Sequence, residues 1–316
     1  MSTSSLRHLL AICLCAAAAA AFGGPIAYVP NEKSGSVSMV DVDSDKVVGE
    51  LRVATRPRGI AVSPDGSRLY LSDQAANALR VVDVARREMV RQIPLGQSPE
   101  GISLSRDGRW LAAAIEEANS VLLIDTATSA VVASVATQGK NPEHAVFSPD
   151  GAWLYVSAED ASQVDVIDVA ARRQVDSVMV GRRPRGIGFT SDGRYAYVAC
   201  ELDSTVYVIE VATRKVAATV PAGQFSNGIV VSPDDKRVYV SNGRGASVSV
   251  IDTSTHQVTA TIGVGQRPWN MALTADGRKL YVANGRSNSV SVIDTRLGAR
   301  VADVPVGDSP WGVAIR

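Results

Sequence analysis

Short apolar runs alternate with turn residues along almost the whole chain. In one stretch the runs 227–232, 237–241, 247–251 and 257–264 are separated by Pro, Asp, Asn and Gly. Val and Ile dominate these runs, and none of them reaches the length of a typical helix. We therefore predict an all-β chain of short antiparallel strands joined by tight turns.

The four-run pattern repeats about every 42 residues. The turn between the first two runs carries an Asp in six places, at Asp65, Asp107, Asp150, Asp192, Asp234 and Asp276. An acidic residue ends the third run of all seven units, at Asp41, Asp83, Asp125, Asp168, Glu210, Asp252 and Asp294. Seven units of four strands predict a seven-bladed β-propeller, because closure into a ring removes most of the exposed sheet edges.

The two ends of the chain indicate how this ring closes. The first run, 26–29, corresponds to the second strand of a unit, and the last run, 311–316, to a first strand. We expect one blade to be built from both ends, with the C-terminal strand pairing with the N-terminal blade.

Residues 1–22 have the features of a secretory signal peptide. Arg7 and His8 precede an apolar stretch rich in Leu and Ala, and small residues follow. The stretch is short for a membrane span of about 20 residues, so cleavage is favoured over a retained anchor. We expect a periplasmic or secreted protein with one propeller domain at 23–316 and no membrane insertion after cleavage. This domain contains a single cysteine, Cys200. We interpret its thiol as unreactive, because the negative charge of the neighbouring Glu201 disfavours the thiolate.

Composition narrows the class of partner. Lys and Arg number 32, as do Asp and Glu, so the electrostatic footprint of a nucleic-acid binder is missing. The sequence has no Cys-x-x-Cys-His haem motif, no phosphate-binding glycine loop and no Gly-x-Ser-x-Gly motif.

One group of residues resembles a known repeat. Leu280-Tyr281-Val282-Ala283-Asn284, followed by Ser289-Val290-Ser291-Val292-Ile293-Asp294, resembles the YVTN family β-propeller repeat. The Tyr recurs as Tyr28, Tyr70, Tyr155, Tyr197 and Tyr239, whereas the third unit has Ala112. An exported chain of seven such repeats is similar to the propeller family associated with pyrroloquinoline quinone (PQQ)-dependent alcohol catabolism.

That resemblance implies which proteins this one works with, and not which reaction it carries out. The family is encoded beside quinoprotein dehydrogenases and transport components. It implies a periplasmic partner, namely a quinoprotein dehydrogenase, a cytochrome or a transport component, or else a small ligand. We expect a monomer with no cofactor and no metal.

Residues that vary at one position of the repeat are the candidates for function, because a residue present in every unit serves the scaffold. The connection from the fourth run to the next first run varies most, and it should circle one mouth of the central channel. Its candidates are Arg58, Glu100, Glu143, His144, Arg185, Asn227, Trp269, Asn270 and Trp311. Arg244 and Arg286 form a basic sector in loops on the same face, opposite an acidic sector of Glu116, Glu117, Glu159, Asp160, Glu201 and Asp203.

Three hypotheses follow. The favoured one is a non-catalytic module that binds a partner or ligand on this face, with the two tryptophans exposed as anchors. The alternative is a propeller-type lactonase or related hydrolase, in which Glu100, Glu143 and His144 bind a divalent cation or act as acid and base. Arg58 and Arg185 would then orient an anionic substrate. A third is non-covalent haem bound by His144.

Overall fold

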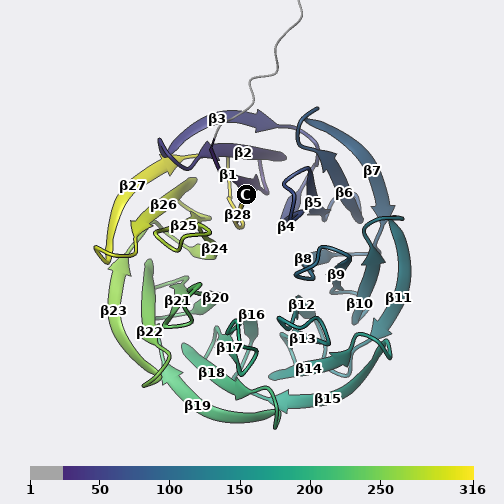
Figure 1. Cartoon of the computed structure of the whole chain (residues 1–316), viewed down its shortest axis with the longest axis vertical. Coiled ribbons are helices and arrows are strands. Elements are labelled where there is room, and N and C mark those ends of the chain that lie inside the picture. Colours follow the sequence, from purple (N-terminus) through teal and green to yellow (C-terminus); the bar gives the residue numbers. More distant parts are fainter. Residues whose placement is uncertain (1–23) are drawn as a thin grey trace, which may run out of the picture.

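The computed structural model describes residues 24–316. Over these residues, 28 strands form seven four-stranded antiparallel sheets, arranged as blades around a common axis (Figure 1). The predicted seven-bladed β-propeller is confirmed. The predicted signal peptide at 1–22 lies outside the described residues, and within them no helix is long and apolar enough to cross a membrane.

Each blade contributes one strand to each of four concentric positions. The innermost strands are β28 (Ala314–Ile315), β4 (Pro57–Val62), β8 (Pro99–Leu104), β12 (Pro142–Phe147), β16 (Pro184–Phe189), β20 (Ser226–Val231) and β24 (Pro268–Leu273). The second strands are β1 (Ile26–Asn31), β5 (Arg68–Asp73), β9 (Trp110–Ile115), β13 (Trp153–Ala158), β17 (Tyr195–Cys200), β21 (Arg237–Asn242) and β25 (Lys279–Asn284). The third strands are β2 (Ser36–Asp41), β6 (Ala78–Asp83), β10 (Ser120–Asp125), β14 (Gln163–Asp168), β18 (Thr205–Glu210), β22 (Ser247–Asp252) and β26 (Ser289–Asp294). The outer strands are β3 (Lys46–Leu51), β7 (Glu88–Pro94), β11 (Ala130–Ala136), β15 (Arg173–Met179), β19 (Lys215–Pro221), β23 (Gln257–Gly263) and β27 (Ala299–Pro305).

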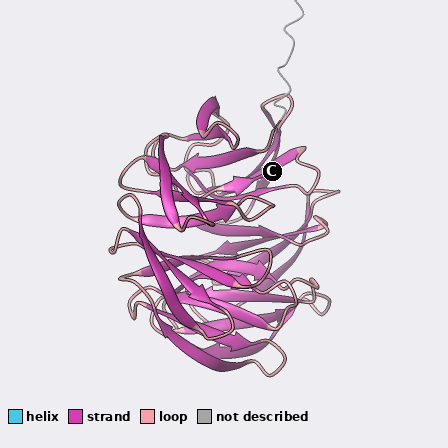
Figure 2. Ribbon diagram, turned by 60° about the vertical axis from the view of Figure 1, so that its left-hand side comes forward, coloured by secondary structure: helices cyan, strands magenta, loops and turns pink. Residues whose placement is uncertain are grey.

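The hydrophobic core lies in layers between neighbouring blades, which stack face to face (Figure 2). Tyr28 and Met39 of the first blade pack in one cluster with Leu69 and Leu71 of the second. The repeated tyrosines are all buried, as expected for packing residues, and Ala112 is buried at the same place in the third blade. Burial of this apolar surface is the main stabilising contribution to the ring.

The acidic residue that ends each third strand stabilises a turn. Asp125 accepts a hydrogen bond from the backbone N–H of Thr128 at 2.8 Å, and Asp168 accepts one from Ala171 at 2.8 Å. Asp41, Asp83, Asp252 and Asp294 accept equivalent backbone bonds, and the seventh residue, Glu210, accepts a bond from the Thr213 hydroxyl instead. The prediction that these residues serve the scaffold is confirmed.

The ring closes as predicted, through the pairing of β28 with β1. Arg316 and Ile26 exchange two backbone hydrogen bonds at 2.7 and 3.0 Å, and the Trp311 N–H donates to Pro30 O at 2.9 Å. Trp311 is only 8 % exposed, so the expectation that both tryptophans are exposed is wrong for this one. The C-terminal segment therefore contributes both a strand and a buried aromatic ring to the first blade.

Deletion of 311–316 should destabilise the protein by about 3 kcal/mol or more, because it removes these backbone bonds and buried apolar surface. For a chain of this size, that corresponds to a fall in melting temperature of about 5–10 °C. Val301→Ala, at a half-exposed position of an outer strand, is the control and should melt close to the wild type. An unchanged melting temperature of the truncated chain would contradict this account of ring closure.

Candidate functional site

Most inner strands begin with a β-bulge. The pairing with the second strand skips the two residues after the leading Pro, as between Pro99 and Ile102 or between Pro268 and Met271. A bulge bends its strand and redirects side chains. The skipped residues, which include Glu100 and Trp269, thereby line a cavity where the inner strands begin.

Serines on the second strands hold these bulges in place. Ser72 Oγ accepts a hydrogen bond from Gly59 N at 2.8 Å and donates one to Glu100 O at 2.6 Å. Ser241 donates an equivalent bond to Trp269 O at 2.5 Å. Each of these serines connects one blade to the next and fixes the backbone of a residue that lines the cavity.

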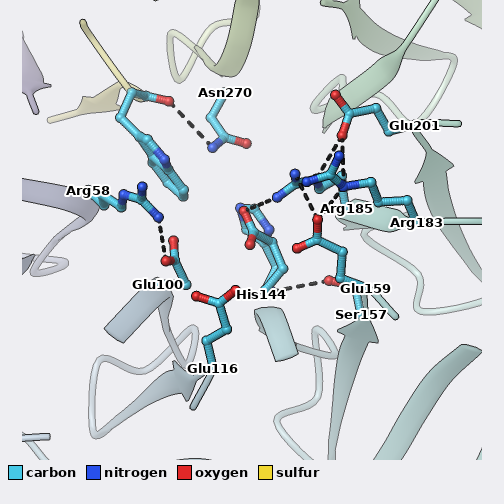
Figure 3. A network of polar contacts seen from close by, with 12 residues as sticks. Arg58, Glu100, Glu116, His144, Ser157, Glu159, Arg183, Arg185, Glu201 and Asn270 are labelled. Carbon is cyan, nitrogen blue, oxygen red and sulfur yellow. Dashed lines mark hydrogen bonds and ion pairs between the residues drawn. The ribbon is translucent and has the colours of Figure 1, made fainter. Parts of the chain in front are cut away.

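The bulges come together in a cavity of about 290 Å³, which we call the channel-mouth cavity. Its volume lies near the lower end of the range of small-molecule sites, about 300–1,000 Å³. It is lined by Arg58, Gln74, Glu100, Glu116, Glu143, Glu159, Arg183, Arg185, Asn227, Arg267, Trp269, Asn270 and Trp311. Figure 3 shows Arg58, Glu100, Glu116, Glu159, Arg183, Arg185 and Asn270 of these.

The structure brings most of the predicted site residues together. Of the eleven candidates, eight line the cavity: Arg58, Glu100, Glu143, Arg185, Asn227, Trp269, Asn270 and Trp311. His144 lies next to the cavity, stacked on Trp311. Arg244 and Arg286 are exposed residues outside its lining, and Arg244 lies over the ring of Phe225 instead.

Three lining residues were missed, namely Gln74, Arg183 and Arg267, whereas Glu116 and Glu159 were predicted as part of an acidic sector on this face. The first residue of each turn after the second strand is, blade by blade, Glu32, Gln74, Glu116, Glu159, Glu201, Gly243 and Gly285. Comparing units at this position would have added Gln74 to the predicted acidic sector, and would also have identified the two glycines on the other side of the cavity. A Cβ at Gly285 would lie 2.9 Å from the ring of Trp269, so this Gly makes room for the indole.

Arg185 is the centre of the polar network on one side of the cavity. Its Nη1, Nη2 and Nε atoms lie 2.7, 3.0 and 3.0 Å from carboxylate oxygens of Glu143, Glu159 and Glu201. Arg183 contacts the last two of these as well (Figure 3). The three carboxylates are nearly fully buried, and charge-assisted bonds of this kind compensate for their lost hydration.

Arg58 connects two carboxyl groups on the opposite side. It contacts Glu32 at 3.1 Å and donates a short hydrogen bond to Glu100. Glu100 is 1 % exposed, and its Oε1 also accepts a hydrogen bond from Gln74 Nε2 at 2.9 Å. Glu100 Oε2 and Gln74 Oε1 are buried atoms with no hydrogen-bond partner among the described residues.

The pKa values of two neighbouring carboxyl groups are shifted in opposite directions. Burial raises the pKa of Glu100 to about 8, and the negative charge of Glu143 adds to the effect against the smaller influence of Arg58. The pKa of Glu143 is lowered: burial opposes ionisation, but the charges of Arg185 and its other neighbours together outweigh it. Glu100 is therefore protonated at neutral pH, while Glu143 is ionised.

The number of charged groups also indicates that one carboxyl group is protonated. Within the described residues, the network contains six carboxyl groups, Glu32, Glu100, Glu116, Glu143, Glu159 and Glu201, and five guanidinium groups, Arg56, Arg58, Arg183, Arg185 and Arg267. One retained proton balances these charges, and Glu100, whose pKa is raised to about 8, is the group that holds it.

Ser98 connects Glu100 to a second, more accessible carboxylate. Its hydroxyl lies 2.7 Å from Glu116 Oε2 and 3.3 Å from Glu100 Oε1. A protonated carboxyl and a half-exposed carboxylate thus share one hydroxyl at the wall of the cavity. This arrangement can give a proton at one group and accept one at the other.

His144 closes the far side of the site. Its ring stacks on Trp311, with centroids 5.5 Å apart and an angle of 18° between the planes. Burial lowers the pKa of His144, so the ring is neutral at neutral pH. Nδ1 has no hydrogen-bond partner in residues 24–316.

Two other expectations concern metals and thiols. Among the described residues, no group of three or more His, Cys, Asp or Glu side chains is placed to hold a metal ion. Cys200 is fully buried, and burial raises the pKa of its thiol to about 12. The interpretation of Cys200 as an inert thiol therefore agrees with its surroundings.

Fold and site define a seven-bladed β-propeller with a charged cavity walled by tryptophan. A family model described as "Lactonase, 7-bladed beta-propeller" matches residues 170–300, and one described as "YNCE-like beta-propeller" matches residues 11–109. No curated protein matches the chain at a significant level.

Solved structures with the same fold include enzymes. Hydrazine synthase of Kuenenia stuttgartiensis is 27 % identical with a TM-score of 0.76, over 84 % of this chain and 91 % of that one. A functionally unknown protein from Desulfotomaculum acetoxidans DSM 771 is 17 % identical (TM-score 0.81; 92 % and 98 % covered). The dihydro-heme d1 dehydrogenase NirN is 16 % identical (TM-score 0.69; 91 % and 74 % covered).

These comparisons correct one expectation. A non-catalytic protein was predicted, but the lactonase family model covers most of the second half of the chain, and that is an enzyme family. The prediction was wrong because the repeat pattern reports the blade scaffold, and a scaffold carries no information about chemistry.

The protonation of Glu100 predicts how stability depends on pH. The folded protein keeps this proton up to about pH 8, whereas an unfolded Glu releases it near its ordinary value of 4.5. The wild type therefore loses stability as pH rises through this window, and Glu100→Gln should not show that part of the loss.

Urea unfolding of both proteins at pH 5 and pH 9 measures the effect. The quantity compared is the unfolding free energy of the variant minus that of the wild type. We expect this difference to be about 1–3 kcal/mol larger at pH 9 than at pH 5. Glu88→Gln, on an outer strand, should show no such shift. A difference for Glu100→Gln that is independent of pH would mean that Glu100 is ionised throughout.

Proposed function

We propose that this protein hydrolyses small lactones in the channel-mouth cavity. The observation that carries the proposal is the pair of Glu100 and Glu116, joined by the Ser98 hydroxyl, with one carboxyl protonated and the other accessible. The match of residues 170–300 to a lactonase family supports the choice of reaction.

The pair supplies both proton transfers that lactone hydrolysis needs. Glu116 takes a proton from water as its oxygen attacks the acyl carbon. Glu100 gives its proton to the ring oxygen as the bond between that oxygen and the acyl carbon breaks, so the product is an open-chain hydroxy acid. Glu116 is then protonated and Glu100 ionised, and the Ser98 hydroxyl between them is placed to relay the proton back.

The ion pairs around Arg185 set the protonation states that this reaction needs. Glu143 keeps its charge because Arg185 contacts it, and that charge helps Glu100 to hold its proton. In this mechanism Glu143 and His144 take no direct part in proton transfer, unlike in the arrangement expected from the sequence. Glu143 acts on Glu100 electrostatically, because its negative charge raises the pKa of the Glu100 carboxyl.

The proposal is tested with simple five- and six-membered lactones and a pH-indicator assay. We expect wild-type turnover above the uncatalysed rate, with activity falling as pH rises through about 8, because Glu100 then loses its proton. Glu100→Gln and Glu116→Gln should each lower kcat by about 100-fold or more.

Glu88→Gln is the matched control for these substitutions, because Glu88 is exposed on β7 and lies outside the cavity. It should keep the wild-type rate. Full activity of either cavity variant would remove that residue from the mechanism, and wild-type protein that hydrolyses no lactone would disprove the function.

Compartment and pathway are further proposals from the sequence. We propose that residues 1–22 direct export and that the hydrolase acts in the periplasm beside PQQ-dependent alcohol oxidation. Cell fractionation with an antibody to the protein should place it in the periplasmic fraction. Recovery in the cytoplasm would contradict export.

A further inference from the structure

One amide group in the channel-mouth cavity has no partner. Asn227 lines the cavity and is only 5 % exposed, yet its side chain forms no hydrogen bond with any described residue. Its nitrogen and oxygen both keep accessible surface, whereas Glu100 Oε2 and Gln74 Oε1 are sealed in the wall. The neighbouring amide of Asn270, by contrast, donates to Trp311 O at 3.5 Å. A nearly buried amide without a partner lowers stability, which is typical of groups that act in function.

The other groups at this position of the repeat already have partners. Arg58 contacts Glu32 and Glu100, and Arg185 contacts Glu143. The expectation that these two arginines orient an anionic substrate is not supported, because each binds protein carboxyl groups. The two remaining positions carry tryptophans, which present indole faces to the cavity. Among the described residues of this ring, Asn227 is thus the polar side chain that is left for a ligand.

The backbone of Asn227 is held in place from two blades. Asn227 belongs to the bulge of β20, and in the same bulge Gly228 N donates to Ser241 Oγ at 2.8 Å. On the neighbouring blade, a Cβ at Gly186 would lie 2.6 Å from Asn227 O, so the glycine lets the two inner strands approach closely. The amide is therefore presented by a fixed backbone, as a preorganised hydrogen-bond donor must be.

This amide lies across the channel from the pair that transfers protons. β20, which carries Asn227, and β8, which carries Glu100, lie on opposite sides of the axis (Figure 1). A lactone ring in the cavity can thus meet the carboxyl pair with one side and the amide with the other. We infer that Asn227 is a further catalytic residue of the proposed reaction, and that its amide N–H group binds the acyl oxygen of the substrate. This inference rests on the proposed function and adds the charge stabilisation that Glu100 and Glu116 do not supply.

The bond from Asn227 is strongest when negative charge develops on the acyl oxygen. As the oxygen of water adds to the acyl carbon, its proton passes to Glu116 and the π electrons of the C=O bond move onto the acyl oxygen. The Asn227 amide donates to this oxyanion. The double bond then forms again as the bond to the ring oxygen breaks, and Glu100 gives its proton to that oxygen. The amide is not consumed, and donors of this kind raise kcat by about 100- to 1,000-fold.

Asn227→Leu tests this role, because it removes both polar atoms at a similar side-chain volume. With five- and six-membered lactones, kcat should fall by about 100-fold and KM should change by less than about threefold. The melting temperature should equal or exceed that of the wild type, because no hydrogen bond within the protein is lost. Gln257→Leu, which removes an exposed amide on β23, is the control and should keep the wild-type kcat. A wild-type kcat in Asn227→Leu would overturn the inference and leave the proposed function intact.

A thionolactone tests whether the amide contacts the acyl oxygen itself. In δ-thionovalerolactone sulfur replaces this oxygen, and sulfur is a weak hydrogen-bond acceptor. A change in the fold or in the position of Glu100 lowers kcat/KM for δ-valerolactone and for the thionolactone alike. Loss of the contact lowers the ratio of the two values, by about tenfold or more. If this ratio is the same in Asn227→Leu and in the wild type, the contact does not exist.

Binding separates this inference from the proposed function. δ-Valerolactam has the same ring size and acyl oxygen but is not readily hydrolysed. Its binding can be followed by tryptophan fluorescence, because Trp269 and Trp311 line the cavity. If no lactone is hydrolysed but the lactam binds the wild type at least about threefold more tightly than Asn227→Leu, the contact stands and the proposed function falls. If no lactone is hydrolysed and the lactam binds both proteins equally or not at all, both are overturned.

Discussion

The pairing of the last strand with the first holds the other elements of this protein in their places. Seven twisted sheets meet around one axis only if the ring is closed, and closure depends on the bonds between Ile26 and Arg316. Because all the inner strands run in the same direction, their first residues meet at one end of the axis. Residues far apart in the sequence, such as Arg58 and Trp311, thereby share one cavity.

Closure also explains the unusual electrostatics of that cavity. Six carboxyl groups converge on five guanidinium groups in a space that excludes most solvent, so the surplus carboxyl keeps its proton. Buried ion pairs of this type contribute little to net stability. Their effect here is to keep Glu143 charged and Glu100 neutral side by side. The same contacts pair each arginine of the cavity lining with a protein carboxyl group.

The repeat made the fold and the ring of varied residues predictable, since strand period, turn residues and unit length all agree. Comparison of the same position between units correctly predicted that Glu100, Arg185 and Trp269 lie at the channel mouth. It overlooked Gln74 and placed Glu116 only in an acidic sector of the same face, because only one of the two loop positions that converge there was compared residue by residue. The non-catalytic prediction failed for a different reason: a propeller scaffold is compatible with many activities.

The sequence by itself determined what is local and periodic: the strands, the Asp turns, the buried tyrosines and the strand order at closure. These depend on neighbours within one unit, which the repeat displays seven times. Only the tertiary structure decided which carboxylate faces which arginine, that Trp311 is buried against His144, and that Glu100 keeps its proton. Such properties depend on distances between blades and on exclusion of water, and neither is written in the order of residues within a unit.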